Sequence, residues 1–252
     1  MAAHILHTNL LSAGSAVELT ATGFDAGWEF ANALNIGTAL KAQVLLGVVG
    51  VAEYDLGVIA PISSVAIARH NFGTANANIK VSVASNQAGP WSVLVDHSPI
   101  DDDVLLVVEP VITGRYVRVE VQNHTQAAIF SVVCVGDALK LPRSMPNGFI
   151  PPEFGAQDQV TASYTAGTEL AGLSIKRQPA KTRAIIKEAP RKWFFDNWRE
   201  LQVALLKNTV FFRWKETGST LYGTLASKKS PNPKFVKTYY MTVNIDFQGF
   251  IS

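Results

Sequence analysis

The chain has 252 residues, enough for one large domain or two ordinary ones. Apolar residues make up 48% of it and charged residues 17%, a composition that excludes an intrinsically disordered chain. The net charge of +2 is too small to indicate nucleic-acid binding by bulk electrostatics.

The first half of the chain reads as a series of short strands. Residues 78–84 (NIKVSVA) and 116–121 (YVRVEV) alternate strictly between apolar and polar positions, as half-buried strands do. Turn residues such as Gly89 and Pro90 separate the strands. The other strand candidates are 44–51, 54–59, 64–69, 91–95, 104–108 and 128–135. Many short strands at near-regular spacing predict an antiparallel β-sandwich.

The order of these strands resembles the galactose-binding-like jelly roll, the discoidin-type sandwich. The segments that carry the resemblance are SSVAIARHNF, NIKVSVASN, a Gly-Pro-Trp turn, a long loop and GRYVRVEVQN, and they span roughly residues 9–135. Domains of this type often bind sugars or protein surfaces through loops at one end, and many others are structural adaptors. The resemblance implies no particular ligand residue.

A domain boundary is predicted at residues 143–155, within the sequence LPRSMPNGFIPPEFG. Four prolines and two glycines in these fifteen residues exclude a helix or a central strand. Charge changes sign here as well. Up to residue 150 there are 7 Lys and Arg against 12 Asp and Glu, a net of −5; from residue 151 there are 15 against 8, a net of +7. We therefore predict a β-sandwich over 1–142, a linker over 143–155 and a second domain over 156–252. The opposite charges suggest docking within the chain or between copies, or two modules that simply differ.

The second half contains one predicted helix, over residues 196–207. Asp196 is a plausible N-cap, and Trp198, Leu201 and Leu205 fall on one helical face. A last strand is predicted over 237–247, with Tyr239 and every second residue to Phe247 on one face. Further strands are expected over 169–177, 182–187, 209–215 and 220–227. The fold class is therefore mainly β: an N-terminal jelly roll followed by an α+β sandwich with one helix.

The second half resembles the tail-tube fold of bacteriophage tube, distal-tail and tail-terminator proteins, in architecture and in its aromatic-rich final strand, KTYYMTVNIDFQGF. The resemblance implies a ring of copies, a hexamer or a trimer, with the first domain projecting outward. The implied partners are other tail proteins and a host-surface glycan. The implied location is the virion, after assembly in the cytoplasm of the host bacterium.

Candidate ligand residues are few. His70 and Asn71 lie where a strand ends, and the indole of Trp91 could stack on a sugar, although a solvated histidine and a packed indole are the competing interpretations. Asp101, Asp102 and Asp103 could hold Ca²⁺, but three consecutive carboxylates on an extended loop cannot all converge, and a solvated loop is favoured. No cofactor, nucleophile-elbow or phosphate-loop motif is found, so we expect a protein that is not an enzyme.

Basic residues run through the start of the second half, beside the aromatic Trp193, Phe194 and Phe195. Such a run can bind single-stranded nucleic acid, but strand alternation spreads these charges over two faces, so contacts between subunits are preferred. The basic residues concerned are Lys176, Arg177, Lys181, Arg183, Arg191 and Lys192.

Two properties concern the location of the chain. The single cysteine, Cys134, lies in an apolar run and cannot form an internal disulfide, so a buried side chain is expected. The N-terminus lacks the pattern of a signal peptide, and carboxylates and a proline interrupt the apolar segment 43–62, so no membrane contact is expected.

Two functions remain from the sequence. The first is a structural component of a bacteriophage tail tip or baseplate that also contributes to host attachment. The alternative is a carbohydrate-binding adhesion module that acts outside a virion. A glycan-active enzyme is a weaker third interpretation, because paired carboxylates cannot be recognised from sequence.

Overall fold

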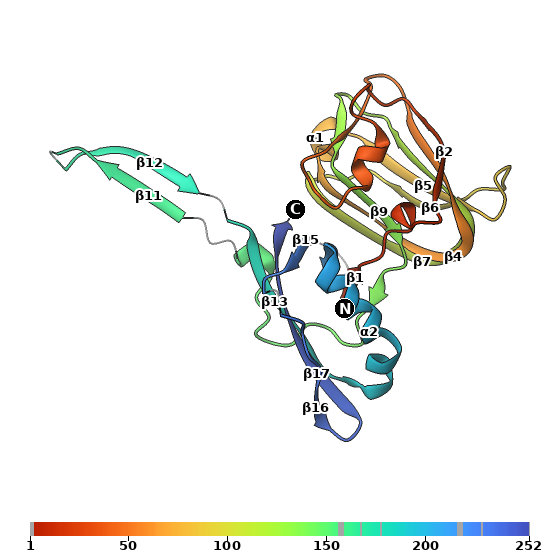
Figure 1. Cartoon of the computed structure of the whole chain (residues 1–252). Coiled ribbons are helices and arrows are strands. Elements are labelled where there is room, and N and C mark those ends of the chain that lie inside the picture. The colour runs from red at the N-terminus through yellow and green to blue at the C-terminus, as the bar shows by residue number, and fades with distance from the viewer. Residues whose placement is uncertain are drawn as a thin grey trace.

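A computed structural model describes residues 3–155, 159–166, 168–176, 178–215, 219–227 and 229–251. Most of these residues lie in β-strands, and the prediction of a mainly β protein is confirmed. Figure 1 shows a closed N-terminal jelly roll beside a more open C-terminal part, from which one long hairpin projects.

The jelly roll is built on two long strands, β4 and β7, that pair antiparallel over most of their length, with register shifts between Asp55 and Ala60, between Ile62 and Ser64 and between Ala68 and His70. The N-terminal half of β4 and the C-terminal half of β7 form one layer with β2, β5 and β6. The C-terminal half of β4 pairs with β9 in the second layer. The elements are η1 (Leu10–Ser12), β2 (Val17–Thr22), η2 (Phe30–Leu34), β3 (Ala42–Val44), β4 (Gly50–His70), α1 (Phe72–Ala75), β5 (Asn78–Ala84), β6 (Ser92–His97), β7 (Asp103–Gln122), β8 (Ala128–Phe130) and β9 (Val132–Gly136).

Apolar side chains at alternate positions of these strands fill the space between the two layers. Ile79, Val81 and Val83 of β5 and Val117 and Val119 of β7 are buried as the period-two pattern predicted. The core also contains a cluster of aromatic rings, formed by Phe24, Phe30, Tyr54, Phe72 and Phe130.

Three strand predictions are wrong. The candidate 128–135 is divided into β8 and β9, and the candidates 54–59 and 64–69 are parts of the single strand β4. Residues 44–51 were expected to be a single strand, but the chain turns between β3 and β4. Gly47 has a φ of 76°, a conformation that suits glycine, and the N–H of Val48 donates to the carbonyl of Leu45 across the turn. Leu45, Leu46, Val48 and Val49 are consequently exposed.

The main sheet of the C-terminal part has the order β10-β1-β14-β15-β17-β13, and β16 also pairs with β17; β11 and β12 form a separate two-stranded sheet. Its elements are β1 (His4–Leu6), β10 (Leu139–Lys140), η3 (Pro152–Phe154), β11 (Gln159–Tyr164), β12 (Leu170–Lys176), β13 (Ala180–Pro190), α2 (Arg191–Lys207), β14 (Val210–Arg213), β15 (Thr220–Leu225), β16 (Lys234–Lys237) and β17 (Tyr240–Ile251).

Helix α2 covers one face of this sheet through Phe194, Trp198, Leu201 and Leu205, so the predicted apolar face is confirmed. The predicted start is wrong. The helix begins at Arg191, because Pro190 precedes it with a fixed φ of −56°. Asp196 is therefore not an N-cap; it lies inside the helix and pairs with Lys192 at 2.7 Å.

The final strand also begins later than predicted. Tyr239 lies in the turn between β16 and β17 and is 73% exposed, whereas Val243, Ile245 and Phe247 are buried on one face as expected. Upstream, the strand predicted over 169–177 is β12, and it pairs with β11 in a two-stranded sheet. We call this hairpin, residues 159–176, the arm; it extends away from the rest of the molecule in Figure 1.

The strand pairing differs from the predicted division at residues 142 and 143. Both β1, which precedes the jelly roll, and β10, which follows it, lie in the C-terminal sheet, and β1 pairs with β10 and with β14. The predicted linker also packs on that part: Phe149 contacts Phe212 and Trp214, and the Thr182 hydroxyl donates to the Ile150 carbonyl at 2.7 Å. The jelly roll is thus inserted between two neighbouring strands.

A buried apolar cluster joins the two parts. Tyr222 adds a polar contact: burial raises the pKa of its hydroxyl to about 12, and this hydroxyl donates to the Ile36 carbonyl at 2.6 Å. Burial likewise raises the pKa of the Cys134 thiol, as expected for a cysteine that packs as a small apolar residue. The cluster contains Leu6, Ala66, Ala68, Val104, Leu106, Val132, Cys134, Ala138, Phe211 and Tyr222.

Candidate functional site

A pocket of about 450 Å³ lies at the end of β4, where the jelly roll meets the C-terminal part. Its volume is within the range that small-ligand sites occupy. We call it the His70 pocket. Its lining residues are Thr38, Lys41, Arg69, His70, Asn71, Asp103 and Ile129.

His70 is the buried polar residue of this pocket, with an exposed fraction of 4%. Burial lowers the pKa of His70 to about 4, although Asp102 and Asp103 act in the opposite direction, so the ring is neutral at pH 7. Its Nδ1 accepts a hydrogen bond from the Phe72 N–H at 3.2 Å, which places the proton on Nε2. The buried Nε2 has no hydrogen-bond partner among the described residues.

Arg69 and Asp103 form the charged part of the His70 pocket. The guanidinium lies 3.4 Å from the Asp103 carboxylate and 4.0 Å from the ring centroid of Phe250. Phe250 belongs to β17, so the C-terminal part orients a side chain of the jelly roll. Both Arg69 and Asp103 have positive φ values, of 54° and 79°, at the irregular end of the β4–β7 pairing.

Asn71 lines the same pocket, but its amide is already engaged. Its Nδ2 donates to the Ala127 carbonyl at 2.9 Å, and its Oδ1 accepts from the Ile129 N–H at 2.7 Å. These bonds fix the loop before β8 to the end of β4. Asn71 therefore shapes the His70 pocket by holding its wall.

Trp91 does not join His70 and Asn71. It lies beside Arg118, whose guanidinium is 4.2 Å from the ring centroid and is also paired with Glu53 at 2.6 Å. Since β7 separates Arg118 from Asp103 by fifteen residues, the indole belongs to another region of the sandwich. The guanidinium covers one face of the indole, so this face is packed and is not open for stacking on a sugar ring.

The three consecutive aspartates diverge. Asp102 accepts hydrogen bonds from the backbone N–H and the hydroxyl of Thr74; burial raises its pKa, but these bonds outweigh burial and the pKa is lowered. Asp103 faces Arg69, and Asp101 is exposed. Within the described ranges, no three His, Cys, Asp or Glu side chains lie close enough to hold a metal ion.

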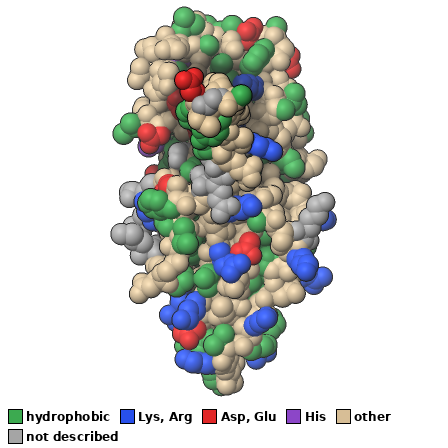
Figure 2. All heavy atoms as spheres, turned by 90° about the vertical axis from the view of Figure 1, so that its left-hand side faces the viewer, with side chains coloured by type: hydrophobic (Ala, Val, Ile, Leu, Met, Phe, Trp, Pro, Cys, Tyr) green, Lys and Arg blue, Asp and Glu red, His purple; other side chains and the backbone are tan. Residues whose placement is uncertain are grey.

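The basic residues predicted to contact other subunits are spread over the C-terminal part, and Figure 2 shows Lys and Arg side chains mainly over its lower half. Lys176 is on the arm and Lys181 on β13, while Arg183 pairs with Asp246 at 2.6 Å. Arg191 lies over the rings of Phe195 and Phe235, and Lys192 pairs within α2. Arg177 lies outside the described residues.

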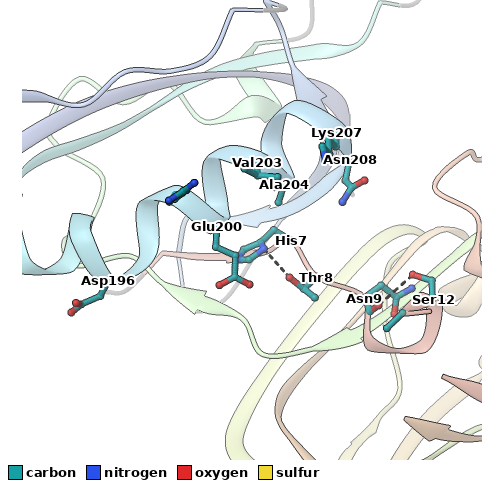
Figure 3. Close-up of a pocket in the computed structure, with 12 residues that line it drawn as sticks. His7, Thr8, Asn9, Ser12, Asp196, Glu200, Val203, Ala204, Lys207 and Asn208 are labelled. Carbon is teal, nitrogen blue, oxygen red and sulfur yellow. Dashed lines mark hydrogen bonds between the residues drawn. The ribbon is translucent and has the colours of Figure 1, made fainter. Parts of the chain in front are cut away.

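A second, larger depression of about 750 Å³ lies between α2 and the segment that leads from β1 into the jelly roll. We call it the α2 groove. Figure 3 shows Glu200 and His7 side by side in it, with Val203 and Ala204 on the helix and Asn9 and Ser12 opposite. Burial lowers the pKa of His7, whereas Glu200 and Asp137 act to raise it.

Some lining residues were missed in the sequence. Lys41 and Thr38 lie in a loop with no recognisable pattern, so nothing in the sequence marks them. Arg69 was detectable, because it directly precedes His70 at the end of an alternating strand.

No protein-family model and no curated protein matches this chain. Solved structures match about half of it. A GH29 fucosidase from Ruminococcus gnavus, in complex with fucose, is 19% identical with a TM-score of 0.44, over 52% of this chain and 27% of the fucosidase. This chain therefore spans about a quarter of the length of that enzyme.

Two further matches are shorter proteins. Chitosan-binding module 1 of a chitosanase/glucanase from Paenibacillus sp. IK-5 is 18% identical with a TM-score of 0.43, over 52% of this chain and 100% of the module. The module CpGH89CBM32-5 of Clostridium perfringens, in complex with GalNAc-β-1,3-galactose, is 9% identical with a TM-score of 0.42, over 49% of this chain and 96% of the module.

Neither described helix is both long and apolar enough to cross a membrane.

Proposed function

We propose that this chain is a non-catalytic protein that binds carbohydrate in the His70 pocket of its jelly roll. The observation that carries the proposal is the His70 pocket itself, about 450 Å³ in volume, which is lined by the charged side chains of Lys41, Arg69 and Asp103 and by the hydroxyl of Thr38.

The remaining pocket residues suit a polyhydroxyl ligand. Each sugar hydroxyl can both donate and accept, and the pocket offers donors from Lys41 and Arg69 and an acceptor from Asp103. Ile129 supplies an apolar surface for the C–H groups of a sugar ring. The neutral state of His70 at pH 7 keeps its donor on one defined nitrogen.

A glycan array followed by calorimetry on the full chain tests the proposal. We expect saturable binding to at least one immobilised glycan, weakened at least tenfold in Arg69→Gln and Asp103→Asn. Arg115→Gln is the matched control, because Arg115 pairs with Asp55 at 2.7 Å outside the pocket. Absence of binding across the array, or an equal loss in Arg115→Gln, contradicts the proposal.

The arm supports a second candidate function: a structural subunit of a bacteriophage tail tip or baseplate. Both strands of the arm are exposed, and paired residues give it one apolar face, as in a segment covered by a neighbour. In this role copies would form a ring, a hexamer or a trimer, in contact with other tail proteins. The chain would be assembled in the host cytoplasm and carried in the virion.

The two candidate functions are compatible, because they use different surfaces. Immunogold electron microscopy of phage particles tests the second. Labelling at the tail tip supports it, and particles that contain no copy of the chain contradict it.

A further inference from the structure

We propose that the carbohydrate bound in the His70 pocket is an oligosaccharide, and that its next sugar unit lies in a second pocket on the C-terminal sheet. The proposal rests on the proposed function, because it extends the same binding site. It makes the two parts of the chain bind one ligand together.

The second pocket has a volume of about 280 Å³ and lies between a jelly-roll loop and strands β15 and β17. We call it the Phe250 pocket. Thr38 lines both this pocket and the His70 pocket. The ring centroid of Phe250 lies 4.0 Å from the guanidinium of Arg69, which lines the His70 pocket. In Figure 1 the C-terminal end of β17 accordingly lies beside the jelly roll. The two pockets therefore meet at Thr38 and Arg69.

One loop of the jelly roll, between η2 and β3, contributes to both pockets. Ile36 and Thr38 line the Phe250 pocket, and Thr38 and Lys41 line the His70 pocket. The Tyr222 hydroxyl donates to the Ile36 carbonyl at 2.6 Å. At the other end of the loop, the Asn32 amide donates to the Lys41 carbonyl at 3.0 Å. Because both ends of the loop are held, one of them by the C-terminal part, the two pockets are preorganised for a ligand that fills both.

Alternation along β17 gives the Phe250 pocket its C-terminal wall. Phe247 packs in the core beneath α2. Because neighbouring residues of a strand point to opposite faces, Gln248 and Phe250 are directed towards the Phe250 pocket, as Phe247 is not. Thr224 is opposite Gln248 in the pairing of β15 with β17, so it lies on the same face.

The Phe250 pocket suits a neutral sugar unit, because none of its described lining residues is charged. The Gln248 amide and the Thr224 hydroxyl can each donate and accept, as sugar hydroxyls require. Ile36 and Phe250 offer apolar surface to the C–H groups of a ring: they are 55% and 36% exposed, the latter although Arg69 covers one face of the ring. A further unit of the same ligand is favoured over a second, separate ligand because the two pockets share lining residues.

A glycan microarray with the full chain tests the proposal. The probes are each oligosaccharide of the array beside its own terminal monosaccharide and disaccharide, among them the series of glucose, galactose, mannose and N-acetylglucosamine. We expect a disaccharide or longer member to bind about tenfold more tightly than its monosaccharide, a gain typical of one or two added hydrogen bonds. A monosaccharide bound as tightly as every longer member overturns this inference and leaves the proposed function standing. Binding to no probe overturns both.

Variants of the Phe250 pocket separate the second sugar unit from the first. Gln248→Ala removes a polar side chain and Thr224→Phe fills the pocket. Both are expected to bind the monosaccharide as the wild type does, which also shows that they fold, and to lose the gain with ligand length. Asn244→Ala, on the same face of β17 but outside the described lining of both pockets, is the matched control and keeps the gain. An unchanged gain in both pocket variants, or an equal weakening of monosaccharide and oligosaccharide, overturns the proposal.

Discussion

His70 makes the stability of the protein depend on pH. Its pKa is about 4 in the folded chain because the ring is buried, against an ordinary value of 6.5. Between these two values the unfolded chain binds a proton at His70 that the folded chain does not, so the free energy of unfolding falls as the pH falls from 6.5. Over the whole interval the loss is about 3 kcal/mol, and at pH 4.5 it is about 2.5 kcal/mol.

The variant His70→Asn separates this effect from the titration of other groups. An asparagine side chain accepts a hydrogen bond from the backbone N–H two residues later, so the amide introduced by this substitution can keep the bond to Phe72 without titrating. Urea denaturation at pH 7 and pH 4.5 gives the free energy of unfolding of each chain. We expect the wild type to lose about 2.5 kcal/mol more than His70→Asn.

The exposed His97 provides the control, since His97→Asn makes the same substitution at a side chain that the fold does not bury. Equal losses for the wild type and His70→Asn would refute the reasoning, because His70 would then carry its proton in both states. The conclusion that the His70 ring is buried and neutral in the folded chain would then be wrong.

Two other predictions concern Tyr222, at the contact between the two parts of the chain, and Ile5, in the core of the C-terminal part. Tyr222→Phe leaves the Ile36 carbonyl without its donor and should cost about 1–2 kcal/mol in urea denaturation, whereas Tyr239→Phe, at an exposed turn, should change stability by less than about 0.5 kcal/mol. Ile5→Ala removes a fully buried side chain of β1 and should cost about 2–5 kcal/mol. A cost below about 0.5 kcal/mol, the size expected of a surface substitution, would show that β1 contributes little to the C-terminal sheet.

The strands with strict alternation could be predicted from the sequence. β5 has the same bounds as the predicted strand 78–84, and the buried faces of α2 and β17 were also expected. Burial of one side of an element makes apolar residues recur at a fixed spacing, which can be recognised in the sequence. The turn at residues 45–49 could not be predicted, since its apolar residues mimic a strand and only the backbone of Gly47 ends it.

The pairing of strands that lie far apart in the chain could not be predicted from the sequence. β1 and β10 are three and two residues long, and nothing in HIL or LK indicates that these segments lie side by side across the whole jelly roll. The His70 pocket was foreseen in part: His70 and Asn71 were named, but Lys41 and Phe250 approach from distant segments. Trp91 was grouped with them because its residue type suits sugars, although its location in the fold does not.

The adjacency of β1 and β10 makes the jelly roll a self-contained cassette. Its first and last residues emerge from neighbouring strands, so another module could be grafted between Leu6 and Leu139, or a tight loop could replace it, while the host sheet keeps its order. Exchange of this cassette would therefore replace the His70 pocket without any change in the strand order of the host sheet.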